Sequence, residues 1–145
     1  MTGNVFRDKH YWAASMAAPL FVAVLIQVSQ PIGLIFTRSI IIPIILLVII
    51  YPVLEEVVFR GLIQGLLLQH SIGIKQWRGI SVANILSSLA FVLSHLIYHS
   101  LLWSLIIIIP SLIFGFFRER YQNITLGIIL HCWYNACYYF VYLPQ

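Results

Sequence analysis

Charged residues are scarce in this chain: they make up 8% of its 145 residues, and only four of them are acidic. An average soluble domain has about 25% charged residues, so this chain has too few polar groups to cover itself in water. Its 61% hydrophobic content is typical of an integral membrane protein. The length allows about five membrane-spanning helices of roughly 20 residues each and excludes a separate soluble domain.

Cysteine is also rare, with only Cys132 and Cys137 present. Their spacing inside an apolar run fits neither a metal knuckle nor a disulfide framework, so we expect both to be packing residues. Internal repeats are absent, and so is the alternating pattern of a membrane β-barrel. The net charge of +4 is scattered between apolar runs instead of gathering on one face, which argues against a nucleic-acid partner.

Apolar stretches separated by polar or basic segments predict an all-α fold, a multi-pass transmembrane helix bundle of about five spans. The stretches cover residues 11–28, 39–69, 80–98, 101–117 and 124–143. We therefore treat residues 1–145 as one membrane-embedded domain.

The second stretch is too long for a simple span, because about 30 helical residues measure about 45 Å against a hydrocarbon core of about 30 Å. It predicts either one helix kinked at Pro52 or two short helices, which would give six spans. With one span and a cytoplasmic N-terminus, six basic residues fall on the cytoplasmic side and only Arg38 falls outside. We therefore expect five spans, with the C-terminus outside.

Three charged residues, Glu55, Glu56 and Arg60, lie near the middle of this long span. Each ionised side chain there costs at least about 2.5 kcal/mol on insertion scales, so something must offset that cost. Glu56 and Arg60 are four residues apart on one helix face, which predicts a buried ion pair. Glu55 points about 100° away and has no local partner in the sequence.

Polar residues also recur at helical spacing on two later stretches. One stripe consists of Asn84, Ser88, Phe91 and His95, and the other consists of His131, Asn135 and Tyr138. Lipid would leave such groups unsatisfied, so we expect a carboxylate, two imidazoles and an amide to meet inside the bundle. For Asn84 and Ser88, hydrogen bonds between helices are the simpler explanation.

Three motifs follow one another along the chain: residues 55–60 match EExxxR, residues 91–95 match FxxxH, and residues 131–135 match HxxxN. In this order the chain resembles the CAAX-protease and bacteriocin-processing family (CPBP, or Abi). Each motif alone is weak, but three in order on expected membrane helices are a strong signal. The resemblance covers residues 52–143, which would form the catalytic core.

The resemblance implies a glutamate-dependent intramembrane endopeptidase that needs no cofactor. Glu55 would be the general base that activates water, assisted by His95. His131 and Asn135 would hold the oxyanion of the tetrahedral intermediate. The ion pair of Glu56 and Arg60, named above, would fix the helix and the local field.

Zinc is the alternative cofactor, since two glutamates and two histidines can bind Zn²⁺ and leave a position open for water. The HExxH helix of many zinc proteases is missing, but ligands spread over three helices do not exclude the metal. A non-enzymatic transport partner or a membrane scaffold is a further alternative. No pair of repeats with broken helices supports transport, and a scaffold should tolerate substitution of Glu55.

The expected partners are the lipid bilayer and a membrane-anchored protein or peptide substrate. If the stretches are unbroken helices, His131 lies about 16 Å from Arg120, and His95 lies about 25 Å from Arg78. The resemblance implies one of three substrates: prenylated C-termini, leader peptides or sorting tails of exported proteins. The depth indicates a site at mid-membrane or in the outer half, which favours removal of a C-terminal sorting tail. The lack of an organelle address is typical of a bacterial cytoplasmic membrane protein.

Overall fold

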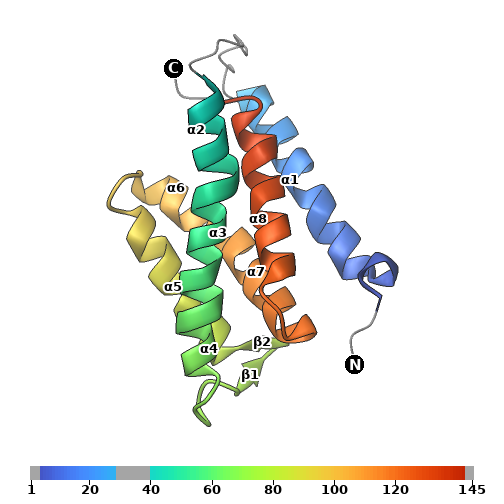
Figure 1. Ribbon diagram of the computed structural model, residues 1–145, viewed down its shortest axis with the longest axis vertical. Helices are drawn as coiled ribbons and strands as arrows, with labels where there is room; N and C mark the ends of the chain where they lie inside the picture. The colour runs from blue at the N-terminus through green and yellow to red at the C-terminus, as the bar shows by residue number, and fades with distance from the viewer. Residues whose placement is uncertain (1–3, 29–39, 143–145) are drawn as a thin grey trace. The chain divides into compact units, whose positions relative to one another are not determined.

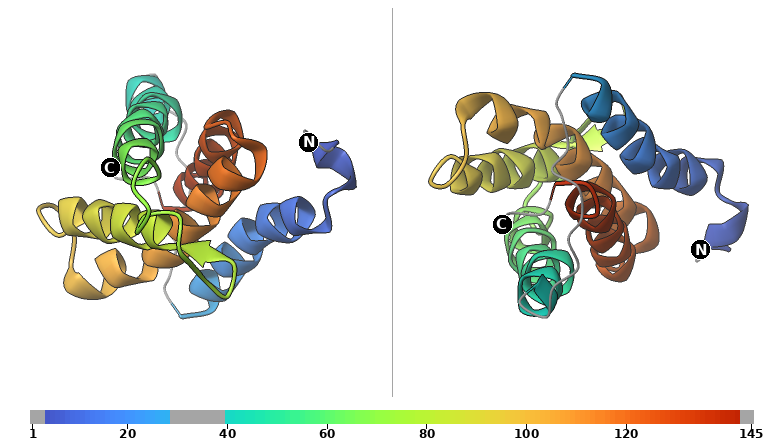
Figure 2. Two further views of the ribbon diagram at one scale, coloured as in Figure 1. Left: turned by 90° about the horizontal axis from the view of Figure 1, so that it is seen from below. Right: turned by 90° about the horizontal axis from the view of Figure 1, so that it is seen from above.

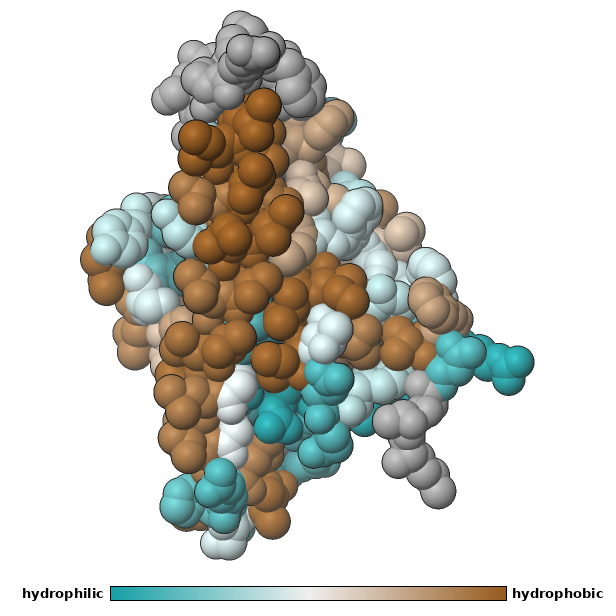
Figure 3. Space-filling view, viewed as in Figure 1, coloured by the Kyte–Doolittle hydropathy of each residue, from teal (hydrophilic) through white to brown (hydrophobic). Residues whose placement is uncertain are grey.

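The computed structural model describes residues 4–28 and 40–142, and helices account for most of them (Figure 1). Three helical segments are long and apolar enough to cross a membrane: Lys9–Gln27, Ile41–Leu67 and Leu101–Tyr121. Shorter helices, Val82–His95 and Thr125–Tyr139, complete five helical segments in this described part of the chain. The surface over Ile41–Leu67 is hydrophobic along most of its length (Figure 3). The prediction of an all-α membrane protein is confirmed.

The contacts divide the chain into two compact units. The first consists of Met1–Val53 together with Ile129–Gln145, and the second consists of Leu54–Ile128. The boundary therefore runs through the long helix and through the last helix. Two of the three sequence motifs, EExxxR and FxxxH, fall in the second unit, whereas HxxxN falls in the first.

The first unit is built from α1 (Lys9–Val28), the beginning of the long helix and most of α8 (Thr125–Tyr139). The long helix begins as α2 (Ile41–Ile45), passes through a π-helical turn, η3 (Leu46–Ile50), and continues as α3 (Tyr51–Glu56). In the stretch that allowed one span or two, Ile41–Leu67 therefore form one continuous helix.

Pro19 interrupts the hydrogen bonding of α1, and α8 compensates for the loss. A proline has no N–H to donate to the carbonyl four residues earlier, which here belongs to Ser15. Trp133 Nε1 donates to that carbonyl at 2.8 Å. The neighbouring Tyr134 hydroxyl donates to the Ala14 carbonyl at 2.9 Å. These two bonds tie α8 to α1.

Pro52 has a similar consequence in the long helix, because a carbonyl of the adjacent π-helical turn η3 lacks its backbone donor. The Tyr51 N–H donates to the Leu46 carbonyl, five residues back. In this register the donor for the Leu47 carbonyl would be residue 52, a proline without an N–H. Asn135 Nδ2 on α8 donates to the Leu47 carbonyl at 2.8 Å instead.

The second unit contains the rest of the long helix, which passes through a second π-helical turn, η4 (Val57–Ile63), and ends as α4 (Gln64–Leu67). An antiparallel hairpin of β1 (Gln76–Trp77) and β2 (Ile80–Ser81) leads into α5 (Val82–His95). The hairpin was not predicted, because the apolar stretch 80–98 indicated a helix from residue 80. The strands are two residues long, too short for a period-2 pattern to appear.

The loop of the hairpin fits its sequence. Arg78 and Gly79 have φ angles of 51° and 83°, and left-handed backbone at both central residues is characteristic of a type I′ turn. Ser81 then caps α5, because its Oγ accepts a hydrogen bond from the Asn84 N–H at 2.9 Å.

After α5, the chain turns back through α6 (Leu101–Ile106) into α7 (Ile108–Tyr121), and α6 lies alongside α5 (Figure 2). The helices α5 and α7 pack closely through small and polar residues. A Cβ on Gly115 of α7 would overlap the amide of Asn84. Asn84 Nδ2 donates to the Leu112 carbonyl at 3.0 Å. A glycine and a buried amide thus replace the large apolar side chains of a water-soluble core.

Candidate active site

The predicted ion pair is present in the second unit. Arg60 Nη1 lies 3.4 Å from Glu56 Oε1, and both side chains are completely buried. Arg60 Nη2 donates to the carbonyl of Ser111 at 2.8 Å and to its hydroxyl at 2.7 Å. A Cβ on Gly127 would come within 2.7 Å of Glu56 Oε2, so only a glycine lets α8 approach this carboxylate closely. Because a buried charge without partners is very costly, these contacts hold Arg60 in one position.

The π-helical turn η4 carries Arg60, and two neighbouring helices bond to it. The Gln64 N–H donates to the Phe59 carbonyl, five residues back. Ser87 Oγ on α5 donates to the same carbonyl at 2.7 Å. Arg118 Nε on α7 donates to the Arg60 carbonyl at 3.2 Å. Single π-helical turns are frequent at functional sites, and here the wide turn offers carbonyls to side chains of α5 and α7.

Phe91 connects the first two motifs. Its ring centroid lies 4.9 Å from Arg60 Cζ and 4.3 Å from the centroid of the His95 ring. Its carbonyl lies 2.9 Å from His95 Nδ1. Because a carbonyl only accepts hydrogen bonds, Nδ1 carries the hydrogen of the neutral ring, and Nε2 is the nitrogen that takes up a proton.

Glu55 lies next to this network but differs from its neighbour in burial. It is half-buried, whereas Glu56 is completely buried. Consecutive helical residues point about 100° apart, so the two carboxylates have different surroundings, as the sequence predicted. The structure therefore brings Glu56, Arg60, Phe91 and His95 together in the second unit, with Glu55 one residue away on α3.

His131 and Asn135 belong to the first unit. His131 is 5% exposed, which agrees with the predicted inward orientation of this stripe. Asn135 uses one N–H for the Leu47 carbonyl, and its second N–H has no hydrogen-bond partner among the described residues. The prediction that these two residues face Glu55 and His95 involves both units, and it stays a prediction.

The estimate of depth in the membrane needs a correction. It counted unbroken helix from the basic residues, but a hairpin precedes α5, and Gln122 turns into the left-handed conformation with a φ of 53° before α8 begins. From the first residue of its own helix, His95 is about 20 Å away and His131 about 9 Å away. The two distances counted from Arg78 and Arg120 therefore no longer support a site in the outer half of the membrane.

Several buried polar residues of the second unit were missed in the sequence. These are Gln64, Ser81, Ser87, Ser104 and Ser111, all at most 1% exposed. Gln64 continues the spacing of four residues from Glu56 and Arg60, so extending that stripe by one turn would have found it. The serines carry no comparable signal, because serine is common at contacts between membrane helices.

A metal site would need several His, Cys, Asp or Glu side chains close together. Among the described residues of either unit, no three His, Cys, Asp or Glu side chains form a group that could hold a metal ion. Glu56, one of the four ligands considered for zinc, already pairs with Arg60.

Comparison with known proteins assigns the chain to a family. A family model described as Type II CAAX prenyl endopeptidase Rce1-like matches residues 37–137, more than half of the chain and all three motifs. No curated protein and no solved structure matches it. This match identifies the protein as an intramembrane peptidase, an enzyme that hydrolyses peptide bonds of a protein substrate within the bilayer. The chain belongs to the Rce1-like family, and the resemblance seen in the sequence is confirmed.

Proposed function

We propose that the protein cleaves a peptide bond near the C-terminus of a membrane-anchored protein, using a water molecule activated by Glu55. The observation that carries this proposal is the buried network of Glu56, Arg60, Phe91 and His95. It fixes the turn that bears Glu55 and the imidazole expected to assist it. Such rigid positioning of an acid–base pair is what general-base catalysis needs.

The proposed reaction needs no serine or cysteine nucleophile. Glu55 removes a proton from water, and the resulting hydroxide attacks the carbonyl carbon of the peptide bond. His131 and Asn135 donate hydrogen bonds to the oxyanion, each worth roughly 3 kcal/mol by analogy with other acyl-transfer enzymes. The proton on Glu55 then passes to the leaving amine, so that the carboxylate is restored. His95 orients the water and tunes the carboxylate.

The two neighbouring carboxylates would have separate tasks. Glu56 is completely buried and paired with Arg60, so its charge is already compensated inside the protein. Glu55 is only half-buried, and the proposed mechanism requires that a water molecule reaches its carboxylate. We therefore assign proton transfer to Glu55 and support of the helix to Glu56 and Arg60.

Two classes of substrate fit the proposal. The family name points to prenylated CAAX proteins, and the sequence interpretation points to sorting tails of exported proteins. Both substrates present a C-terminal tail beside a lipid anchor or membrane helix. We place the protein in the bacterial cytoplasmic membrane, with its N-terminus and the hairpin on the cytoplasmic side because their basic residues favour that side.

The test is cleavage by purified protein in lipid vesicles, with one substrate ending in a prenylated CAAX tail and one ending in a membrane-embedded sorting tail. The proposal predicts that one of them is cleaved and that Glu55→Gln abolishes cleavage. Equal cleavage by Glu55→Gln would overturn the glutamate mechanism. No cleavage of either substrate would favour the scaffold or transport alternative.

The same assay with a zinc chelator distinguishes a mechanism that needs no cofactor from a zinc-dependent one. The glutamate mechanism predicts the same rate before and after treatment with a zinc chelator. A rate that falls and returns on adding Zn²⁺ would favour the zinc alternative, with the carboxylates and imidazoles as ligands.

A further inference from the structure

Buried polar side chains form a line along one face of the long helix in the second unit. Glu56, Arg60 and Gln64 follow one another at intervals of four residues, and all are completely buried. The facing helix α7 presents Ser111 to Arg60 and Glu119 to Gln64. The line therefore extends about two helical turns beyond Glu56, away from the residues assigned to catalysis.

The far end of this line is held by Glu119. Gln64 Nε2 donates to Glu119 Oε1 at 2.7 Å and to the Gly115 carbonyl at 3.1 Å. Ser81 Oγ donates to the same carboxylate oxygen. Glu119, on α7, thus connects Gln64 of α4 with Ser81, the N-cap residue of α5. No sequence pattern indicates this role, because Glu119 lies between two arginines and resembles a solvated surface residue.

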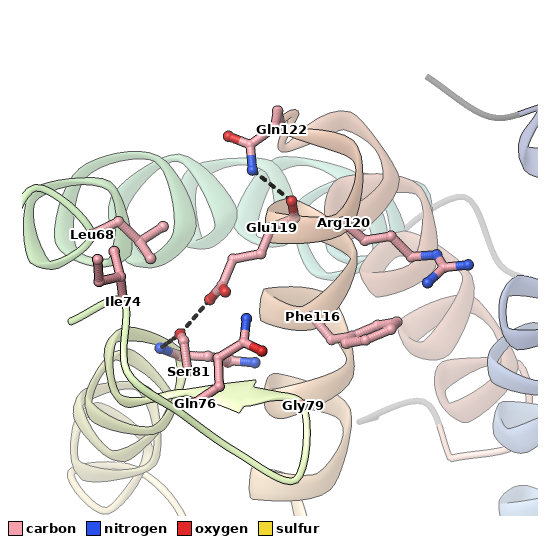
Figure 4. A pocket seen from close by; sticks show the side chains of 10 residues that line it. Leu68, Ile74, Gln76, Gly79, Ser81, Phe116, Glu119, Arg120 and Gln122 are labelled. Atoms are coloured by element: carbon pink, nitrogen blue, oxygen red, sulfur yellow. Dashed lines mark hydrogen bonds between the residues drawn. The ribbon is translucent and has the colours of Figure 1, made fainter. Parts of the chain in front are cut away.

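A cavity of about 570 Å³ opens at Glu119, between the hairpin and the end of α7. Its polar lining includes Gln76, Ser81 and Asn84, and its apolar lining includes Leu68. Figure 4 shows the Glu119 carboxylate extending into this space toward Ser81 and Gln76. A cavity of this size has room for many water molecules, and its polar lining groups can bind them.

Buried polar atoms that lack a hydrogen bond continue from the cavity into the protein, and one of them, Arg60 Nη1, has only its ion pair with Glu56. Gln64 Oε1, Arg60 Nε and Arg60 Nη1 are buried and make no hydrogen bond within the described residues. Buried polar groups in folded proteins are nearly always hydrogen-bonded, often to internal water. Two donors and one acceptor, one helical turn apart, can bind a short file of water molecules.

We propose that this polar line is a water channel, which admits water from the cavity past Glu119 and Gln64 to the Arg60–Glu56 pair. Gln64 Oε1 accepts from the first internal water, and Arg60 Nε and Nη1 donate to the next ones. Only the use of this water for hydrolysis rests on the proposed function. The channel brings water, the second substrate of hydrolysis, as far as Glu56, the residue next to the proposed base Glu55.

The test is hydroxyl-radical labelling by X-ray radiolysis of the purified full chain in detergent, because radicals form wherever water is bound. Phe91 and Phe114 are the reporters: they are 3% and 1% exposed, and their ring centroids lie 4.9 and 5.7 Å from Arg60 Cζ. We expect both rings to be oxidised despite their burial. The variant Gln64→Leu should lower this oxidation several-fold.

Gln69→Leu is the matched control, since the same substitution at an exposed glutamine just after α4 leaves the line intact. Its labelling of both rings should equal that of the natural sequence, and the exposed Trp77 reports equal dose in every sample. Unlabelled Phe91 and Phe114 in the natural sequence, or equal labelling in Gln64→Leu, would overturn the channel. If Gln64→Leu does not fold, labelling of the natural sequence decides alone.

Labelling also separates this proposal from the proposed function, because it requires neither substrate nor cleavage. Oxidised rings in a protein that cleaves nothing would support the channel and count against the peptidase mechanism. Cleavage by a protein whose two rings stay unlabelled would uphold the mechanism and reject the channel.

Discussion

Buried polar side chains are satisfied differently in the two units. In the second unit, Glu56, Arg60, Gln64 and Glu119 bond mainly to one another and to the facing helices. In the first unit, polar side chains of α8 donate to backbone carbonyls, two of which lack their helical donor because of a proline. The first arrangement holds charges in place, and the second repairs interrupted helices.

This difference predicts that polar residues on apolar helices contribute very different amounts to stability. Removing one member of a buried ion pair leaves an uncompensated charge, whereas removing a neutral hydrogen bond between membrane helices costs about 0.6 kcal/mol on average. We therefore expect substitutions in the second unit to affect stability much more than substitutions in the first.

The largest effect is expected for Arg60→Leu, which leaves Glu56 buried without its counter-charge. The free energy of unfolding in mixed micelles should fall by about 3–5 kcal/mol. The double variant Glu56→Leu with Arg60→Leu should recover a large part of that loss, because no charge then remains buried. A double variant that loses as much as the two single variants added together would show that the pair is not coupled.

A smaller loss is expected for Gly115→Ala, because the new Cβ overlaps the Asn84 amide and separates α5 from α7. Overpacking of this kind typically costs about 1–3 kcal/mol. Gly65→Ala is the control on the long helix, since its Cβ would make only ordinary contacts, with Arg118 Nη2 at 3.6 Å and the Arg60 carbonyl oxygen at 3.9 Å. Thermal unfolding of both variants tests the close approach of the two helices, and equal melting temperatures would refute it.

In the first unit, Asn135→Ala and Tyr134→Phe each remove one hydrogen bond to a backbone carbonyl. Each should lower the free energy of unfolding by only about 0.6 kcal/mol. Cleavage should be lost in Asn135→Ala and kept in Tyr134→Phe, because only Asn135 is assigned to the oxyanion. Equal activity of the two variants would show that Asn135 has only a structural role, through its hydrogen bond to the Leu47 carbonyl.

An equally small effect is expected for Trp133→Phe, which leaves the Ser15 carbonyl without the indole donor. The loss should again be about 0.6 kcal/mol, and it should vanish in a Pro19→Ala background. Alanine at position 19 supplies the N–H that proline lacks, so the carbonyl regains a partner within α1. A loss of the same size in both backgrounds would contradict this role of Trp133.

Local spacing was enough to predict a substantial part of the second unit. The interval of four residues gave the Glu56–Arg60 pair, and the stripe of Asn84, Ser88 and Phe91 is buried as expected. Such predictions succeed because neighbours on one helix face are fixed by the helical period alone.

The π-helical turns were not predictable in the same way. Two carbonyls of the turn η4 accept hydrogen bonds from Ser87 and Arg118, which are distant in the sequence. The turn η3 ends just before Pro52, where the Leu47 carbonyl is bonded by Asn135, again from a distant helix. A single sequence shows the proline but not the helix that compensates for it.

The central claim is that Glu55 carries out the chemistry while its neighbour Glu56 supports the fold. The most direct measurement compares Glu55→Gln with Glu56→Gln, recording both the cleavage rate and the free energy of unfolding of each purified variant. We predict that Glu55→Gln keeps its stability and loses cleavage, and that Glu56→Gln loses stability because Arg60 is left without its counter-charge. Cleavage by Glu55→Gln at the rate of the natural sequence would contradict the account.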